Sequence, residues 1–173
     1  MKKIDLNRYI KNVPDFPKKG IQFKDITPLL EDEKVFKYTI DEMCRNAPKV
    51  DKIVSADARG FIFGAAMAYK LGVGLVIARK PHKLPRPGYS SSYALEYGEN
   101  TMVISKGAIK KGEKVLVVDD VLATGGSALA MKTIASKAKA KIMGYCFLIE
   151  LTDLKARKKI AHKNIKSLIQ FAI

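Results

Sequence analysis

The residues best suited to chemistry lie in the stretch KVLVVDDVLATGGSALA, from 114 to 130. Four apolar residues, 115–118, run directly into two adjacent carboxylates, Asp119 and Asp120. Adjacent acids repel, and they are costly at the edge of a sheet unless they meet donors such as hydroxyls or a hydrated cation. The stretch therefore predicts a buried strand that delivers two hydroxyl-accepting groups to its carboxyl end.

A glycine-rich turn follows these acids at once, in Thr124-Gly125-Gly126-Ser127. Its glycines allow backbone N–H groups to converge, and Ser127 begins a predicted helix whose N-terminus favours an anion. Alone, such a turn is more simply a strand–helix connection with an N-cap, but the strand and acids before it favour a pocket for a sugar phosphate. No Gly-Lys-Ser/Thr follows, as a nucleoside-triphosphate loop would require. The dinucleotide fingerprint does not match either, because it lacks the paired acids.

The elements around this stretch alternate between strand and helix from Lys52 onward. Strands are expected at 52–56, 75–79, 114–118, 142–151 and 167–172, helices at 61–71, 127–140 and 153–161, and a hairpin from 92–98 and 100–105 with a Gly98-Glu99-Asn100 turn. Apolar strands separated by helices predict an α/β fold, with a mostly parallel twisted sheet covered by helices on both faces and a small hairpin. Ligands of such folds lie beyond the carboxyl ends of the strands. The loops after 52–56, 75–79 and 114–118 should therefore share one crevice.

The first 50 residues follow a different pattern. A short amphipathic helix is expected over 4–12, ending before Pro14, and an irregular segment rich in turn formers follows it. Asp32 can cap a helix over 33–46, where apolar residues recur at helical spacing.

Composition fits one domain of ordinary globular character over all 173 residues. The net charge of +15 could indicate nucleic-acid binding, but only six of the 32 basic residues are Arg, and the lysines are spread along the chain. A solvated basic surface, favourable to an anionic substrate, is the simpler interpretation. The apolar run 60–78 is interrupted by Gly72 and Gly74, which argues against a membrane span.

Cys44 and Cys146 form no metal spacing and no disulfide framework. We expect them to be buried thiols of a cytoplasmic protein. The basic N-terminus lacks the apolar segment of a secretory signal.

VLVVDDVLATGGSA resembles the phosphoribosyl-diphosphate signature of the type I phosphoribosyltransferases. GIQFKDITPLL, ADARGFIFG, ARKPHKLP and SYALEYG resemble, in order and spacing, segments of the members of that family that act on adenine. The resemblance covers nearly all of the chain. It implies transfer of 5-phosphoribose from phosphoribosyl diphosphate to N9 of adenine, giving AMP and diphosphate in purine salvage. The same reaction on hypoxanthine or xanthine, and a non-catalytic regulator that senses phosphoribosyl diphosphate, remain alternatives.

The resemblance also implies roles for residues around the sugar. Asp119 and Asp120 would hold the 2′- and 3′-hydroxyls of the ribose. The 5′-phosphate would be bound by Ala123, Thr124, Gly125, Gly126 and Ser127. The diphosphate would be bound by Arg59, Arg79, Lys80 and Lys83.

For the base, Phe23 would stack on the adenine ring, and the backbone around Gln22 and Lys24 would read its amino edge. Glu96 would be the general acid facing N7. Tyr93 and Tyr97 would help to close a mobile hood over 80–98, while residues 1–50 would form the base-binding part. Gln22 and Lys24 depart from the family's usual residues, as does His82, which stands where glycine is common.

The cofactor implied is Mg²⁺, bound mainly through phosphoribosyl diphosphate with no direct protein ligand. The partners implied are the two small substrates, with no nucleic acid and no membrane. The family is usually dimeric, so a homodimer is expected.

Overall fold

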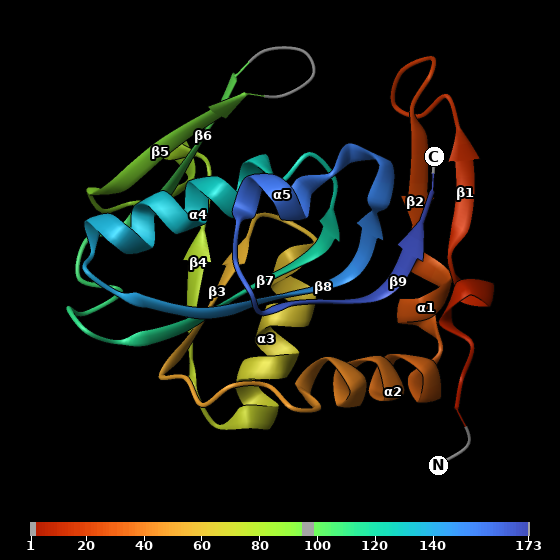
Figure 1. Ribbon diagram of the computed structural model, residues 1–173, viewed down its shortest axis with the longest axis horizontal. Coiled ribbons are helices and arrows are strands. Elements are labelled where there is room, and N and C mark those ends of the chain that lie inside the picture. The colour runs from red at the N-terminus through yellow and green to blue at the C-terminus, as the bar shows by residue number, and fades with distance from the viewer. Residues whose placement is uncertain (1–2, 95–98, 173) are drawn as a thin grey trace.

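The computed structural model describes residues 3–94 and 99–172, and its centre is a five-stranded sheet (Figure 1). The strands lie in the order β4-β3-β7-β8-β9, and each neighbouring pair is parallel. Their bounds are β3 Lys52–Ala56, β4 Gly74–Ala78, β7 Lys114–Leu122, β8 Lys141–Leu151 and β9 Ile165–Phe171. The predicted parallel α/β architecture is confirmed.

Helices cover both faces of this sheet (Figure 1). One face carries α2 (Glu33–Cys44) and α3 (Gly60–Leu71), and the other carries α4 (Gly126–Lys137) and α5 (Ala156–Ile160). Alternate side chains of β7 enter the two cores: Val115 and Val117 pack on the side of α4, whereas Leu116 and Val118 pack on the side of α2 and α3. Because both faces of the strand are buried, its sequence is apolar without interruption.

The helix boundaries follow signals that are legible in the sequence. The Asp32 carboxylate accepts hydrogen bonds from the backbone N–H groups of Lys34 and Val35, each at 3.0 Å, and so caps α2 as predicted. Gly72 ends α3 in the left-handed conformation, with φ at 66°. None of the described helices is long and apolar enough to cross a membrane.

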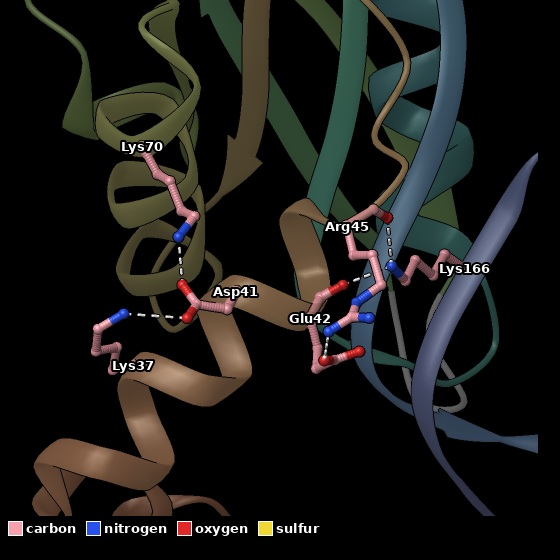
Figure 2. Close-up of polar contacts among 6 residues, drawn as sticks. All are labelled: Lys37, Asp41, Glu42, Arg45, Lys70 and Lys166. Atoms are coloured by element: carbon pink, nitrogen blue, oxygen red, sulfur yellow. Dashed lines mark hydrogen bonds and ion pairs between the residues drawn. The ribbon is translucent and has the colours of Figure 1, made fainter. Parts of the chain in front are cut away.

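Polar contacts tie α2 to its neighbours (Figure 2). The Asp41 carboxylate accepts hydrogen bonds from Lys37, one turn earlier in α2, and from Lys70 of α3. At the end of the helix, Lys166 of β9 donates to the carbonyl oxygens of Glu42 and Arg45, at 2.5 and 2.7 Å. A lysine there adds a donor at the C-terminal end of the helix, where carbonyls have few backbone partners and a positive charge is favourable.

The N-terminal prediction was wrong in part. The expected helix over 4–12 is a single 3₁₀ turn, Leu6–Tyr9, and the chain then forms β1 (Lys11–Pro14). β1 pairs antiparallel with β2 (Gln22–Asp25), inside the segment predicted to be irregular. All side chains of β1 are exposed, so the strand lacks the alternation of apolar and polar residues that would have predicted this hairpin. A short helix, α1 (Thr27–Glu31), follows β2 and leads into α2.

The second hairpin is longer than predicted. β5 (Gly88–Ala94) begins well before Ser92 and pairs antiparallel with β6 (Glu99–Ser105). Its base is fixed because Arg79 and Val103 exchange backbone hydrogen bonds of 2.9 and 2.7 Å. Glu99 and Asn100, expected in the turn, belong to β6, and the connection itself lies outside the described residues.

The C-terminal helix is shorter than the predicted span of 153–161. A 3₁₀ turn, Thr152–Leu154, precedes α5 (Ala156–Ile160), and Lys155 between them is left-handed, with φ at 51°. Another 3₁₀ turn, Pro81–Lys83, follows β4. Cys44 and Cys146 are free and buried, as predicted.

Candidate active site

Loops from three strands of the sheet meet at one edge. Arg59, after β3, forms an ion pair with Asp120 of β7, with Nε and Oδ2 2.7 Å apart. Arg79, after β4, forms a second pair with Asp57 of the β3 loop, at 2.9 Å between Nε and Oδ2. Lys83 approaches the same carboxylate at 3.7 Å. These ion pairs bring the loops after β3 and β4 together with the acidic end of β7, and the shared crevice stays a prediction.

The acidic end of β7 has a strand partner on one side only. The last pair between β3 and β7 joins Ser55 to Val118, whereas β8 remains paired with β7 as far as Leu122. The strand therefore does not end at Val118, as the apolar pattern predicted, but continues through both acids. Beyond Val118, pairing with β8 alone extends the strand, and its other side faces the loop after β3, whose Arg59 pairs with Asp120.

The two acids differ in environment. Asp120 is buried, with 7% of its surface exposed, and faces Arg59. The Asp119 carboxylate accepts a hydrogen bond of 3.0 Å from the Asp120 backbone N–H. Burial, and then the neighbouring Asp120 charge, raise the pKa of Asp119 well above its ordinary value. Ionised Asp119 is thus unfavourable in the free protein, which suits a group that receives donors from a ligand.

Close packing at the start of α3 depends on Gly60. A Cβ built at this position would collide with Oδ1 of Asp119 and would lie 3.2 Å from Oγ of Ser55. The Ser55 hydroxyl instead donates to the backbone, within 2.6 Å of the Gly60 carbonyl and 2.9 Å of that of Val118. Glycine is therefore required at position 60 for the loop after β3 to approach the acidic end of β7.

The glycine turn after β7 surrounds a cavity of about 150 Å³. Its lining comprises Tyr93, Asp119, Val121, Leu122, Ala123, Thr124, Gly125, Gly126, Ser127, Ala128 and Phe147. Gly125 has a φ of +83°, and a Cβ there would lie 3.2 Å from Cβ of Ala156. The helix α4 begins directly afterwards, at Gly126. The Ser127 hydroxyl lies 3.4 Å from that of Tyr93, which links the turn to the second hairpin.

The first hairpin brings Phe23 to the same place. The guanidinium carbon of Arg59 lies 4.7 Å from the centre of the Phe23 ring, and Nη1 of Arg59 donates to the Lys24 carbonyl at 3.3 Å. Phe16 packs edge-on against Phe23, with ring centres 5.0 Å apart. The aromatic ring and the two aspartates thus share Arg59 as a common neighbour.

Some predicted residues are not part of this arrangement. Lys80 and Lys83 are exposed, and of the two only Lys83 contacts the cluster, through Asp57. Glu96 and Tyr97 lie outside the described residues. A cavity of about 460 Å³ between the N-terminal segment, α2 and β9 is larger than the one at the glycine turn, but it contains none of the predicted site residues.

Asp57 is the site residue that the sequence analysis missed. Its carboxylate holds both Arg79 and Lys83, and chiefly the hydrogen bond from Arg79 lowers the pKa of Asp57. Its position offered a signal, since an acid begins the short loop that carries Arg59 from a buried strand to Gly60.

Comparison with known proteins gives a consistent result. A family model described as a phosphoribosyl transferase domain matches residues 32–173. The adenine phosphoribosyltransferase of Thermosipho melanesiensis is 49% identical over 170 residues, covering 97% of both chains. That of Thermotoga maritima is 49% identical over 173 residues, covering 99% of this chain and 100% of its own.

Similar solved structures are also of adenine phosphoribosyltransferases. The crystal structure of adenine phosphoribosyltransferase from Thermoanaerobacter pseudethanolicus superposes with a TM-score of 0.93 at 46% identity, covering 96% of this chain and 98% of its own. The enzyme from Saccharomyces cerevisiae, complexed with D-2,5-dideoxy-2,5-imino-altritol 1,6-bisphosphate and adenine, superposes with a TM-score of 0.87 at 37% identity, covering 94% and 96%.

Proposed function

The chain belongs to the adenine phosphoribosyltransferases of the phosphoribosyl transferase family, and we propose how its site forms AMP and diphosphate from adenine and phosphoribosyl diphosphate. One observation carries the assignment of the site. Asp119 and the glycine turn line one cavity, and the next residue, Asp120, forms an ion pair with Arg59.

The sugar phosphate is bound from two sides. Asp119 and Asp120 accept hydrogen bonds from the 2′- and 3′-hydroxyls of the ribose, which supply the donors that two adjacent acids need. The 5′-phosphate lies in the turn, against the backbone N–H groups of residues 123–126 and the hydroxyls of Thr124 and Ser127. The start of α4 favours that negative charge.

Arg59 binds the diphosphate with its remaining donors. The guanidinium has five N–H donors in a fixed plane. Nε faces Asp120 and Nη1 donates to the Lys24 carbonyl, so the group is held in place, and among the described residues none accepts a hydrogen bond from Nη2. Arg79, Lys80 and Lys83 add positive charge from the loop after β4. A guanidinium fixed in advance loses little freedom when the ligand arrives.

The base binds beside Phe23. Its ring stacks on adenine, and the backbone around Gln22 and Lys24 reads the amino edge. Glu96 acts as the general acid that donates a hydrogen bond to N7, and the proton of N9 passes to the departing diphosphate as the N9 lone pair bonds to C1.

The chemistry is a displacement at C1 of the sugar. The C1–O bond to diphosphate breaks early, positive charge develops on the ring, and N9 of adenine then bonds to C1. Asp119 and Asp120 lie where this charge develops, so they stabilise it electrostatically. Closure of residues 80–98 over the site keeps water from reacting with the sugar cation.

The donor set fits a magnesium ion that arrives with the substrate. Mg²⁺ in proteins generally binds one or two carboxylates together with substrate phosphates. Asp119 lines the cavity and would face such an ion, whereas Asp120 is paired with Arg59. When bound, Mg²⁺ would neutralise charge on the diphosphate leaving group.

The working unit is a homodimer in the cytoplasm. Large apolar side chains are exposed on α3 (Ile62 and Tyr69) and on β4 (Leu75 and Ile77), an edge strand of the sheet. An exposed apolar edge strand favours association with another chain. Ile77→Lys should give a monomer in analytical ultracentrifugation, and a wild-type monomer would contradict the assembly.

The proposed location in the cytoplasm is supported by the cysteines. Cys44 and Cys146 are free and buried, as is usual for proteins of a reducing compartment.

The activity is tested by diphosphate release with a panel of purines. Adenine should support turnover with phosphoribosyl diphosphate, and hypoxanthine and xanthine should not. Faster release with hypoxanthine or xanthine would overturn the choice of base, and no release with any purine would overturn catalysis.

A further inference from the structure

We propose that Lys24 and Phe171 are positioning residues for adenine, because together they attach the base-binding hairpin to the main sheet. The inference rests on the proposed function, in which the backbone of β2 reads the base. It concerns two side chains that were given no such role above. Phe171 is the last residue of β9, far from Phe23 in the sequence.

The hairpin carries a chain of polar contacts on the side of Lys24. Lys24 and Asn12 are directly opposite each other in the β1–β2 register. Nζ of Lys24 donates to Oδ1 of Asn12 at 3.0 Å, and Nδ2 of Asn12 donates to Oε1 of Gln22 at 2.7 Å. Two of the three residues that depart from the family's usual pattern, Gln22 and Lys24, are therefore hydrogen-bonded within the hairpin, and Asn12 links their side chains.

The Lys24 ammonium also lies over an aromatic ring of the main sheet. Nζ is 4.4 Å from the centre of the Phe171 ring, within the range of a cation–π contact. Phe171 is itself fixed, since it pairs with Leu151 of β8 and its carbonyl accepts a hydrogen bond of 3.2 Å from the Thr152 hydroxyl. Figure 1 shows the C-terminal end of β9 rising beside β2.

Lys24 therefore attaches the hairpin at two points. Its ammonium contacts Phe171, and its carbonyl accepts the hydrogen bond from Arg59. β1 and β2 form a sheet of their own, separate from the five-stranded one, so backbone pairing to the large sheet does not hold them. Weakening the contact with Phe171 should let β2, and Phe23 with it, move relative to the ribose site. Adenine binding should suffer and sugar-phosphate binding should not.

The experiment compares Lys24→Met and Phe171→Leu with their conservative counterparts, Lys24→Arg and Phe171→Tyr. We expect the first pair to raise KM for adenine by about 3-fold to 10-fold, the size of one cation–π contact. KM for phosphoribosyl diphosphate and the melting temperature should change little. The conservative pair should retain the wild-type KM for adenine, and Lys19→Met, an exposed lysine in the loop of the same hairpin, is the control.

A double variant, Lys24→Met with Phe171→Leu, should be no worse than the poorer single variant, because each removes the same contact. Additive effects, an unchanged KM for adenine, or an equal rise in both KM values would each overturn the proposal. If Phe171→Leu does not fold, Lys24→Met and Lys24→Arg decide between these outcomes. Failure of the proposed function is distinct, because wild-type protein would then show no turnover with adenine.

Discussion

Nε of Arg59 lies 2.7 Å from Oδ2 of Asp120, and this ion pair joins the loop after β3 to the acidic end of β7. The same guanidinium lies 4.7 Å from the centre of the Phe23 ring. One side chain is therefore in contact with the residues proposed for the base and for the sugar, and it carries the donor proposed for the diphosphate. Substitution of Arg59 should therefore weaken the binding of both substrates.

Arg59→Lys should raise KM for phosphoribosyl diphosphate by at least about 10-fold, because an ammonium cannot reproduce the planar set of donors. Steady-state kinetics with each substrate varied in turn measures this. Arg86→Lys, in the exposed loop before β5, is the matched control and should behave like wild type. Equal effects at the two positions would point to a general loss of positive charge.

Asp119→Asn should abolish turnover and yet raise the melting temperature of the free protein. The folded protein raises the pKa of Asp119, so stability falls as pH rises from the ordinary value toward the folded one. The gain from asparagine should therefore be present at pH 7 and shrink below about pH 4, where aspartate is protonated in both states. Thermal unfolding at the two pH values tests the sign.

Asp120→Asn should lower turnover as well but should not stabilise the protein, because it leaves Arg59 without its carboxylate partner. Similar thermal shifts for the Asp119 and Asp120 variants would show that the two acids do not differ in the way described.

Glu96→Gln should bind phosphoribosyl diphosphate normally and turn over at least ~10²-fold more slowly, the loss expected when a general acid is removed. Equilibrium binding of phosphoribosyl diphosphate, measured beside single-turnover rates, separates the two steps. An unchanged rate would remove Glu96 from the mechanism.

Arg157→Met should destabilise the fold. Arg157 of α5 donates two hydrogen bonds of 2.7 Å to Glu150, which is 4% exposed. We expect a cost of about 2 kcal/mol, below that of a fully buried pair because the Arg157 side chain is 41% exposed. Lys158→Met, on the same helix, is the control for chemical denaturation.

The pH dependence of that cost has a definite sign. Arg157 holds the pKa of Glu150 below its ordinary value. The stability from this pair is therefore complete above the ordinary pKa of glutamate and is lost as pH falls through the folded value. The difference between wild type and Arg157→Met should shrink in acid, and a constant difference would contradict the ion-pair origin.

Gly125→Ala should weaken binding of phosphoribosyl diphosphate and cost about 1–2 kcal/mol of stability, because alanine is strained at a φ of +83°. Gly112→Ala is a matched control, since its φ is +84° and its Cβ would meet open space away from the site. Both should lose stability, but only Gly125→Ala should raise KM for phosphoribosyl diphosphate.

The sequence revealed much of the large sheet because burial on both faces leaves an apolar run that can be read directly, as in 115–118. It did not reveal the β1–β2 hairpin, whose exposed side chains carry no period. Base binding by Phe23 was predicted only through the family resemblance, since an isolated Phe more often belongs to the core, and it stays a prediction. The pairing of Arg59 with Asp120 depends on where the loop after β3 meets the acidic end of β7, which no local sequence pattern encodes.

Unequal lengths of neighbouring strands leave one side of β7 without a strand partner at the two acids, where we propose that the sugar binds. β3 pairs with β7 only as far as Val118, whereas β8 pairs with β7 as far as Leu122. One side of β7 therefore has no strand partner beyond Val118. If β3 paired with β7 for one more residue, it would cover that side of the strand. Both aspartates would still be present, but a ligand could not reach them. The missing strand pairing beyond Val118 is thus as important to the proposed sugar site as the two acids themselves.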